Sequence, residues 1–169
     1  MKVLVTGAGG FLGQSIVSAL LARGDKVCTL QRGDYPALRA SDAIVNKGDI
    51  GDKEAVINAS KGCEAVIHVA AKAGVWGDYQ NYYHSNVRGT VNVIEACRRH
   101  GINRLVYTSS PSIVFDGEDE DGIDESTPIP EHHLTNYQRT KAEAEEFVLS
   151  ENDKTLATVA LRPHLIFGP

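Results

Sequence analysis

The chain has 169 residues, which is enough for one domain with its own core but short for two. Hydrophobic residues make up 42% and charged residues 23%, which excludes a disordered tail, a collagen-like repeat and a disulfide-built miniprotein. The net charge of −5 argues against a nucleic-acid partner, and seven of the acidic residues fall within the segment Asp116–Glu125.

In chain order the pattern of apolar residues first predicts a strand over 2–6, a helix from Phe11 to about Gly24, and strands over 26–30 and 43–45. A short helix capped by Asp52, a strand over 65–69, a helix over 83–99 and a strand over 104–108 follow. The last part is predicted to be a surface loop over 116–134, a helix over about 137–149 and a strand over 157–161. Strands that alternate with helices form right-handed crossovers. We therefore predict an α/β fold: a doubly wound, Rossmann-like parallel sheet of six strands in the order 3-2-1-4-5-6, with its ligand at the carboxyl ends of the strands.

The cysteines and the apolar runs bear on the cellular compartment. The three cysteines show no C-x-x-C spacing, so we expect reduced thiols in a cytoplasmic protein, without a disulfide framework or a metal site. No apolar run approaches the ~18 residues that cross a bilayer, so no membrane span is expected. His68 lies within a predicted buried strand and is interpreted as a hydrogen-bonded core residue.

A glycine-rich segment lies between the first predicted strand and the first helix. Gly7 allows a tight turn, Gly10 lets the backbone approach a pyrophosphate, and Gly13 lets the helix pack closely on the strand. Phe11 and Leu12 open that helix, whose unpaired N–H groups and positive dipole end favour phosphate. The sequence therefore predicts a dinucleotide cofactor.

The end of the second strand bears on which dinucleotide is bound. An acidic residue there would favour NAD, but the sequence has Gln31 followed by Arg32. Because a guanidinium binds a 2′-phosphate well, NADP(H) is the preferred cofactor and NAD(H) remains possible. The alternative is that Arg32 is a solvated loop residue. Asp49 and Ile50 are placed to contact the adenine, although Asp49 could equally be a turn residue.

Tyr137 and Lys141 lie four residues apart at the start of a predicted helix, so both side chains reach the same place. A phenol is a poor general base at neutral pH, and a neighbouring ammonium stabilises its phenolate. Serines follow the fifth predicted strand at the same edge of the sheet, where a hydroxyl could bind a substrate carbonyl. Alternatively, these serines only satisfy the backbone at the strand end.

Six motifs run in order over the whole chain: T-G-x-x-G-F-x-G at 6–13, H-x-A-A at 68–71, N-V-x-G-T at 86–90, Y-x-S-S at 107–110, Y-x-x-x-K at 137–141 and L-R-P-x-x-x-[YF]-G-P at 161–169. With them the chain resembles the extended short-chain dehydrogenases/reductases, also called the NAD-dependent epimerase/dehydratase superfamily. The segments 32–36 and 70–77 are most similar to the 3β-hydroxysteroid dehydrogenase group and to bacterial 2-alkyl-3-oxoalkanoate reductases.

The resemblance implies roles for individual residues. Ser110 would orient the carbonyl, with Ser109 and Ser112 as alternatives, Tyr137 would be the acid/base, and Lys141 would bind the nicotinamide ribose and stabilise the phenolate. The cofactor would also be bound or supported by Ala70, Ala71, Asn86 and Pro163. Val75 and Trp76 would line an apolar substrate pocket, or Trp76 would be a surface residue with a packing role.

The leading hypothesis is a reductase or dehydrogenase that interconverts a ketone and a secondary alcohol on a hydrophobic substrate such as a β-keto acid or a 3β-hydroxysteroid. A nucleotide-sugar epimerase and a non-catalytic dinucleotide-binding sensor are the alternatives. Members of the family continue past the L-R-P motif into a smaller lobe, so residues 1–169 are expected to be an N-terminal fragment that lacks the substrate lobe. Its strand over 157–161 would be an exposed edge that favours a homodimer.

Overall fold

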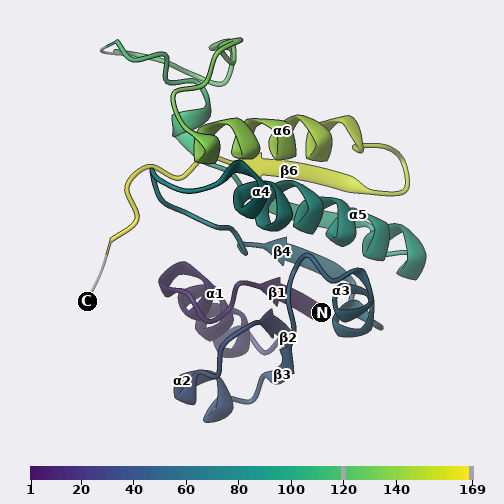
Figure 1. Cartoon of the computed structure of the whole chain (residues 1–169). Coiled ribbons are helices and arrows are strands. Elements are labelled where there is room, and N and C mark those ends of the chain that lie inside the picture. Colours follow the sequence, from purple (N-terminus) through teal and green to yellow (C-terminus); the bar gives the residue numbers. More distant parts are fainter. Residues whose placement is uncertain (119–120, 168–169) are drawn as a thin grey trace.

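The computed structural model describes residues 1–118 and 121–167. Its six strands form one parallel sheet in the order β3-β2-β1-β4-β5-β6, as predicted (Figure 1). The strands are β1 (Lys2–Thr6), β2 (Lys26–Gln31), β3 (Ile44–Lys47), β4 (Ala65–His68), β5 (Arg104–Thr108) and β6 (Ala157–Leu161).

The helical elements in chain order are α1 (Phe11–Ala22), α2 (Pro36–Arg39), α3 (Lys53–Ser60), α4 (Tyr79–Tyr82), the π-helical turn η1 (Tyr83–Arg88), α5 (Gly89–His100), the 3-10 turn η2 (Pro111–Ile113) and α6 (Asn136–Ser150). The predicted cap of α3 is present, since the Asp52 carboxylate accepts hydrogen bonds from the backbone N–H groups of Glu54 and Ala55. None of the helices in the described residues is long and apolar enough to cross a bilayer.

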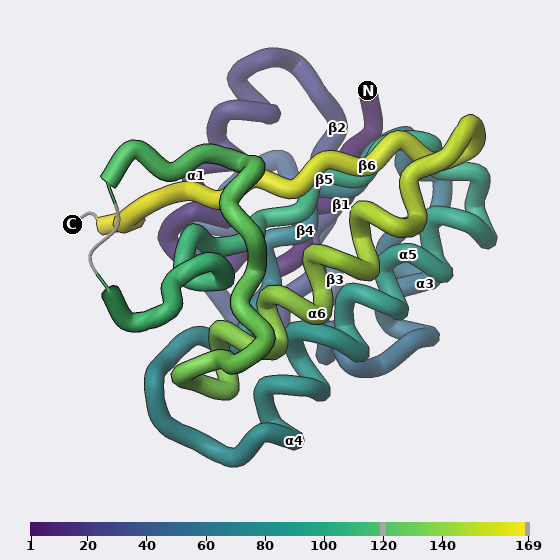
Figure 2. Tube along the Cα trace, turned by 90° about the horizontal axis from the view of Figure 1, so that it is seen from above, coloured from purple at the N-terminus to yellow at the C-terminus, as the bar shows by residue number. Residues whose placement is uncertain are grey.

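Two apolar layers hold the helices to opposite faces of the sheet. Val3, Val5 and Val27 pack on the side of α1, together with Val17 and Leu20 of that helix. The alternate strand residues Leu4, Cys28, Val66 and Leu105 pack on the other side, among side chains of α3, α5 and α6. Figure 2 shows α3, α5 and α6 together on one side of the strands and α1 on the other. Both faces are therefore covered, as a doubly wound sheet requires.

The helix predicted over 83–99 differs in two ways from the observed one. The helical path begins earlier, at Tyr79, and passes through η1 before α5 continues to His100. Gly101 then ends α5 in the left-handed region, with φ of 65°. The apolar spacing of this segment did not distinguish a π-helical turn from an α-helical one.

The carboxyl ends of the strands face the side where the long loop after η2 and the segment after β6 lie (Figure 1). The loop over 116–134 has no helix or strand in its described part, in agreement with the prediction. Asp119 and Glu120 of this loop lie outside the described residues, as do Gly168 and Pro169 of the final motif.

Candidate active site

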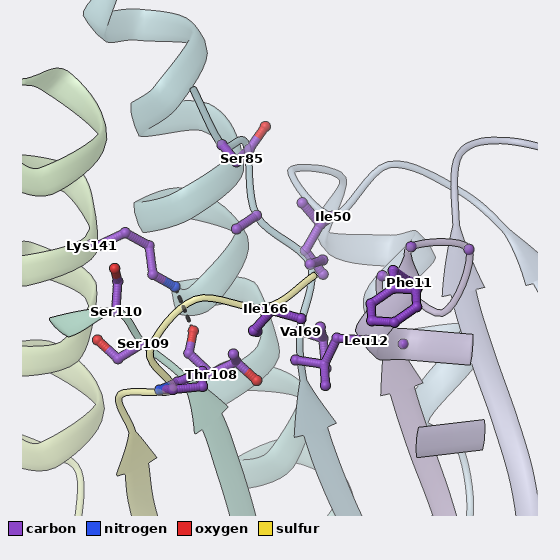
Figure 3. A pocket seen from close by; sticks show the side chains of 18 of the residues that line it. Phe11, Leu12, Ile50, Val69, Ser85, Thr108, Ser109, Ser110, Lys141 and Ile166 are labelled. Atoms are coloured by element: carbon purple, nitrogen blue, oxygen red, sulfur yellow. Dashed lines mark hydrogen bonds between the residues drawn. The ribbon is translucent and has the colours of Figure 1, made fainter. Parts of the chain in front are cut away.

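A cavity of about 790 Å³ opens at the carboxyl ends of the strands (Figure 3). Its wall contains most of the side chains and backbone segments that the sequence predicts for the site: Gly7, Gly10, Phe11, Leu12, Gly13, Arg32, Ile50, Ala70, Ala71, Ser110, Tyr137, Lys141 and Pro163. Asp49 and Asn86 are the predicted cofactor-binding residues that the structure leaves out of this wall. The cavity thus joins the glycine-rich segment at one end to the Tyr137 and Lys141 pair at the other.

The glycine-rich segment fits closely between β1, β4 and α1. Gly7 has φ of +69°, and a Cβ on it would lie 2.7 Å from the backbone of Ala70. A Cβ on Gly13 would collide with the Gly7 carbonyl, so only glycine lets α1 start this close to β1. Gly10 caps α1 without a side-chain hydrogen bond, which leaves the first-turn N–H groups of the helix for a ligand. This cradle fits the pyrophosphate of a dinucleotide.

The end of the cavity next to β2, where the sequence predicts the adenosine, contains two residues that carry no role in the sequence predictions. The Tyr35 ring lies against Gly9, where a Cβ would collide with it, and Tyr35 lines the cavity. Gln31 also lines the cavity, and among the described residues its buried Oε1 has no hydrogen-bond partner. An unpaired acceptor in this place suits a ribose hydroxyl. The unexplained glycine at position 9 was the sequence signal that could have pointed to an aromatic neighbour.

Arg32 and Asp49 lie next to each other at this end. The Arg32 side chain is 74% exposed, and its Nη1 lies 4.0 Å from Asp49 Oδ2. Asp49 Oδ1 accepts a 2.7 Å hydrogen bond from the Gly51 N–H and lies 3.0 Å from His84 Nε2. The Asp49 carboxylate therefore holds the turn at Gly51 outside the cavity wall, and its contact with the adenine stays a prediction.

Lys141 is the most buried charged group of the site. Its side chain is 2% exposed, and its Nζ donates a 2.5 Å hydrogen bond to the Thr108 carbonyl, drawn in Figure 3. Nζ also lies 4.1 Å from the centroid of the Tyr107 ring. Burial lowers the pKa of Lys141 to about 7, because the interior penalises the charged form. Tyr137 lines the same cavity one helical turn earlier, where the Thr135 hydroxyl caps α6 through the Gln138 N–H.

Three serine hydroxyls follow β5 and all line the cavity. Ser110 Oγ accepts from the Ser112 N–H at 3.3 Å and lies 2.8 Å from Ser112 Oγ. Ser109 Oγ is buried and has no partner among the described residues. Ser110 therefore caps η2, which is the backbone role that the sequence offered as one alternative. Because Ser110 and Ser112 both line the cavity, one of their hydroxyls can also face a substrate.

Asn86 lies behind the wall and fixes the segment that follows β4. Its Oδ1 accepts from the Lys72 N–H at 2.7 Å, and its Nδ2 donates to the Lys72 carbonyl at 3.1 Å and to Thr140 Oγ1 at 3.0 Å. Through Thr140 it joins this segment to α6, the helix of Tyr137 and Lys141. The structure thus gives Asn86 a supporting position, without direct access to the cavity.

His68 is a core residue, as the sequence analysis interprets it. Its Nδ1 lies 2.7 Å from Thr6 Oγ1, and its Nε2 lies 3.0 Å from Thr90 Oγ1. Because the Thr90 hydroxyl donates its proton to the Asn86 carbonyl, it accepts from His68, and the ring carries its proton on Nε2. Burial, reinforced by the charge of Lys141, lowers the pKa of His68 to about 3, so the ring is neutral.

Trp76 belongs to a loop that the buried side chain of Tyr82 holds in place. The Tyr82 hydroxyl lies 2.9 Å from the carbonyl oxygens of both Gly74 and Trp76. The Trp76 side chain itself is 89% exposed, and neither it nor Val75 lines the cavity. The structure therefore places Trp76 at the surface, without the packing role and outside the pocket wall.

Comparison with known proteins places this site in a family. Residues 4–169 match the 3-beta hydroxysteroid dehydrogenase/isomerase family. The chain belongs to this family. The predicted resemblance to extended short-chain dehydrogenases/reductases, and within them to the 3β-hydroxysteroid dehydrogenase group, is confirmed.

Two relatives are about half identical to this chain over the region that aligns with it. It is 51% identical to a 2-alkyl-3-oxoalkanoate reductase of Shewanella oneidensis, over 98% of this chain and 44% of the relative. It is 50% identical to the reductase of that name from Stenotrophomonas maltophilia, over 100% of this chain and 52% of the relative. The chain spans about half the length of these relatives.

Solved structures show the same architecture. The complex of Thermus thermophilus UDP-glucose 4-epimerase with NAD is 32% identical and superimposes with a TM-score of 0.84, over 96% of this chain and 54% of the epimerase. The fold is therefore shared with an epimerase, and the chemistry has to be argued from the site.

Proposed function

We propose that this chain forms the cofactor-binding part of an NAD(P)(H)-dependent oxidoreductase that interconverts a ketone and a secondary alcohol on a hydrophobic substrate. The observation that carries the proposal is that one cavity holds the glycine cradle, Tyr137, Lys141 and the serines after β5. The names of the relatives support the substrate class, since they include 2-alkyl-3-oxoalkanoate reductases and a human sterol-4-alpha-carboxylate 3-dehydrogenase.

In this proposal a bound nicotinamide dinucleotide supplies or accepts the hydride. The first-turn N–H groups of α1 bind the pyrophosphate through hydrogen bonds and the helix dipole. Lys141 holds the nicotinamide ribose and stabilises negative charge on the phenol. The Tyr137 hydroxyl donates its proton to the oxygen that becomes an alkoxide during reduction, and it takes a proton back during oxidation. A serine hydroxyl after β5 orients the carbonyl.

We propose NADP(H) as the preferred cofactor. Arg32 supports this choice because its guanidinium lies at the adenosine end with only a 4.0 Å contact to Asp49. Gln31 also supports it, since a neutral amide does not repel a 2′-phosphate as a carboxylate would. The epimerase relative carries NAD in its structure, so NAD(H) is the alternative cofactor.

The proposed function is tested with NADPH and a panel of β-keto acids, 3-keto steroids and nucleotide sugars. The assay uses the protein as its whole gene encodes it, because a substrate needs a wall opposite the nicotinamide to hold it within ~3–3.5 Å. Tyr137→Phe keeps the ring and removes the proton donor, so turnover should fall by roughly 10²-fold or more while NADPH still binds.

The outcomes separate the candidate functions. Oxidation of NADPH by a keto substrate supports the oxidoreductase. Conversion of a nucleotide sugar without net oxidation of the cofactor would indicate an epimerase. Cofactor binding without conversion of any of these substrates would favour a sensor, and a Tyr137→Phe variant that keeps most of its activity would refute the acid/base assignment.

A further inference from the structure

A buried ion pair lies on the helix that carries Lys141, one turn further along. Glu145 is only 2% exposed, and both of its carboxylate oxygens accept hydrogen bonds from Arg162 at 2.6 to 3.2 Å. Arg162 immediately follows β6 and precedes Pro163 of the cavity wall. A bidentate pair of this kind is the strong form of a charge-assisted hydrogen bond. It ties the end of β6 to the middle of α6.

The surroundings of Lys141 leave its positive charge without a carboxylate in contact. Among the described residues, no carboxylate oxygen lies within 4.0 Å of its Nζ, and the Thr108 carbonyl is its hydrogen-bond acceptor. A buried ammonium with so little compensation favours its neutral form. The carboxylate that opposes this effect is Glu145, four residues away on the same face of α6.

Other titratable groups face Lys141 from the neighbouring elements. These groups are His68 on β4, Tyr107 on β5 and Tyr137 on α6 itself. Burial lowers the pKa of His68 to about 3 and raises the pKa of Tyr107, so both rings are neutral near pH 7. The charged neighbours of Lys141 in the described core are therefore Glu145 and, through it, Arg162.

We propose that Glu145 is a positioning residue that keeps the Lys141 ammonium charged, and that Arg162 limits how strongly it does so by holding the carboxylate. This inference deepens the proposed function, because the charge of Lys141 is what stabilises the phenolate. The ion pair is placed so that its removal as a whole leaves the net charge around Lys141 unchanged. Removal of one partner does not.

The two halves of the pair should therefore act on Lys141 with opposite signs. Glu145→Gln leaves the Arg162 cation uncompensated, so the titration midpoint of Lys141 should fall by about one pH unit. Arg162→Met frees the carboxylate toward the ammonium, so the midpoint should rise by about the same amount. The double variant Glu145→Gln with Arg162→Met should return the midpoint close to that of the unmodified chain.

The measurement is an NMR titration of the lysine ε-carbon signals in the 169-residue chain with ¹³C-labelled lysine. The Lys141 signal is identified by its loss in Lys141→Met. Glu146→Gln is the matched control, because it removes the same charge from an exposed position one residue along α6 and should leave the midpoint unchanged. Circular dichroism shows that each variant is folded.

The proposal is overturned if both single variants move the midpoint in the same direction, or if neither moves it. If Glu145→Gln does not fold, the comparison of Arg162→Met with the charge-preserving Arg162→Lys tests the proposal instead. Arg162→Met should raise the titration midpoint of Lys141, and Arg162→Lys should not. The titration needs no cofactor and no substrate. A negative result would therefore leave the oxidoreductase proposal standing, and failure of NADPH to bind would leave the Lys141 result intact.

Discussion

At the adenosine end of the cavity, one side chain carries the proposed choice of cofactor. Arg32 is mostly exposed and is only weakly paired, so its guanidinium is available to a 2′-phosphate. We expect NADPH to bind more tightly than NADH. Arg32→Ala should reduce the ratio of the dissociation constants of NADH and NADPH by roughly tenfold or more, since a lost charge-assisted contact costs about 1.5–3 kcal/mol. Fluorescence titration of both cofactors measures the ratio.

A neighbouring arginine provides the control for this experiment. Arg39 lies on α2, pairs with Asp34 at 3.1 Å and does not line the cavity. Arg39→Ala should leave the ratio of the two affinities unchanged. Equal affinity of the unmodified chain for NADPH and NADH, or a preference for NADH, would contradict the proposed cofactor.

His68 gives a prediction about stability and pH. Its pKa is about 3 in the folded chain, against 6.5 for an ordinary histidine side chain, so only the unfolded chain binds this proton between those two values. Stability from His68 is therefore complete above pH 6.5 and is lost at roughly 1.4 kcal/mol per pH unit as the pH falls toward 3. The free energy of unfolding, measured by denaturant titration, should fall less between pH 7 and pH 5 in His68→Asn than in the unmodified chain. His132→Asn, an exposed control, should keep the full loss.

The roles of individual residues could be predicted from the sequence where they depend on the backbone. The positions of Gly7 and Gly13 follow from the motif, because any Cβ there meets neighbouring backbone. The prediction was incomplete where a role depends on side-chain contacts between distant segments. The contact of Tyr35 with Gly9 and the unpaired Oε1 of Gln31, at the end of β2, depend on which distant segments lie together in the fold, and Gly9 alone does not identify its neighbour.

Among the secondary-structure elements, the strands were predicted best. The bounds of β1, β5 and β6 agree with the prediction, because each strand is a short run of mostly apolar residues that ends abruptly at a polar residue or a glycine. The short elements α2 and η2 were missed. Each has only one turn and begins with a proline, Pro36 or Pro111, and a segment of this length has no periodicity to detect.

The cap of α3 provides a prediction at the level of one helix. Asp52 Oδ1 lies 3.0 Å from the Glu54 nitrogen and 3.3 Å from the Ala55 nitrogen. Asp52→Ala leaves both N–H groups without this acceptor and should lower the free energy of unfolding by about 1 kcal/mol. Asp42→Ala, at an exposed loop position, should change it by less than about 0.5 kcal/mol. Equal effects of the two variants in urea denaturation would show that the cap contributes nothing.

For the whole molecule, the two edges of the sheet differ in their exposed side chains. At one edge β6 presents Val159, which is 44% exposed, together with Leu161. At the other edge β3 also exposes two apolar residues, Ile44 and Val45, but it continues into the polar Asn46 and the charged Lys47. An apolar edge strand without charges favours pairing with another chain, so we propose that the 169-residue chain forms a homodimer through β6.

Substitution at the two edges tests this homodimer. Val159→Lys places a charge on β6 and should shift the chain toward the monomer in light scattering at increasing concentration. Val45→Lys makes the same change on β3 and should leave the association unchanged. A chain that is monomeric at every concentration would show that β6 does not mediate association.

The π-helical turn η1 has a consequence for the length of this segment among related sequences. A π-helical turn holds one more residue than an α-helical turn along the same path. Here the extra residue lets Ser85 line the cavity while the next residue, Asn86, points into the core toward Lys72 and Thr140. Removal of one residue between Tyr83 and Asn86 would turn this segment into a regular α-helix along the same path, and the residues of the turn could no longer divide between the cavity and the core as they do here. A one-residue gap at this place in a homologue would therefore mark a different arrangement of Ser85 at the cavity, even where every other motif is retained.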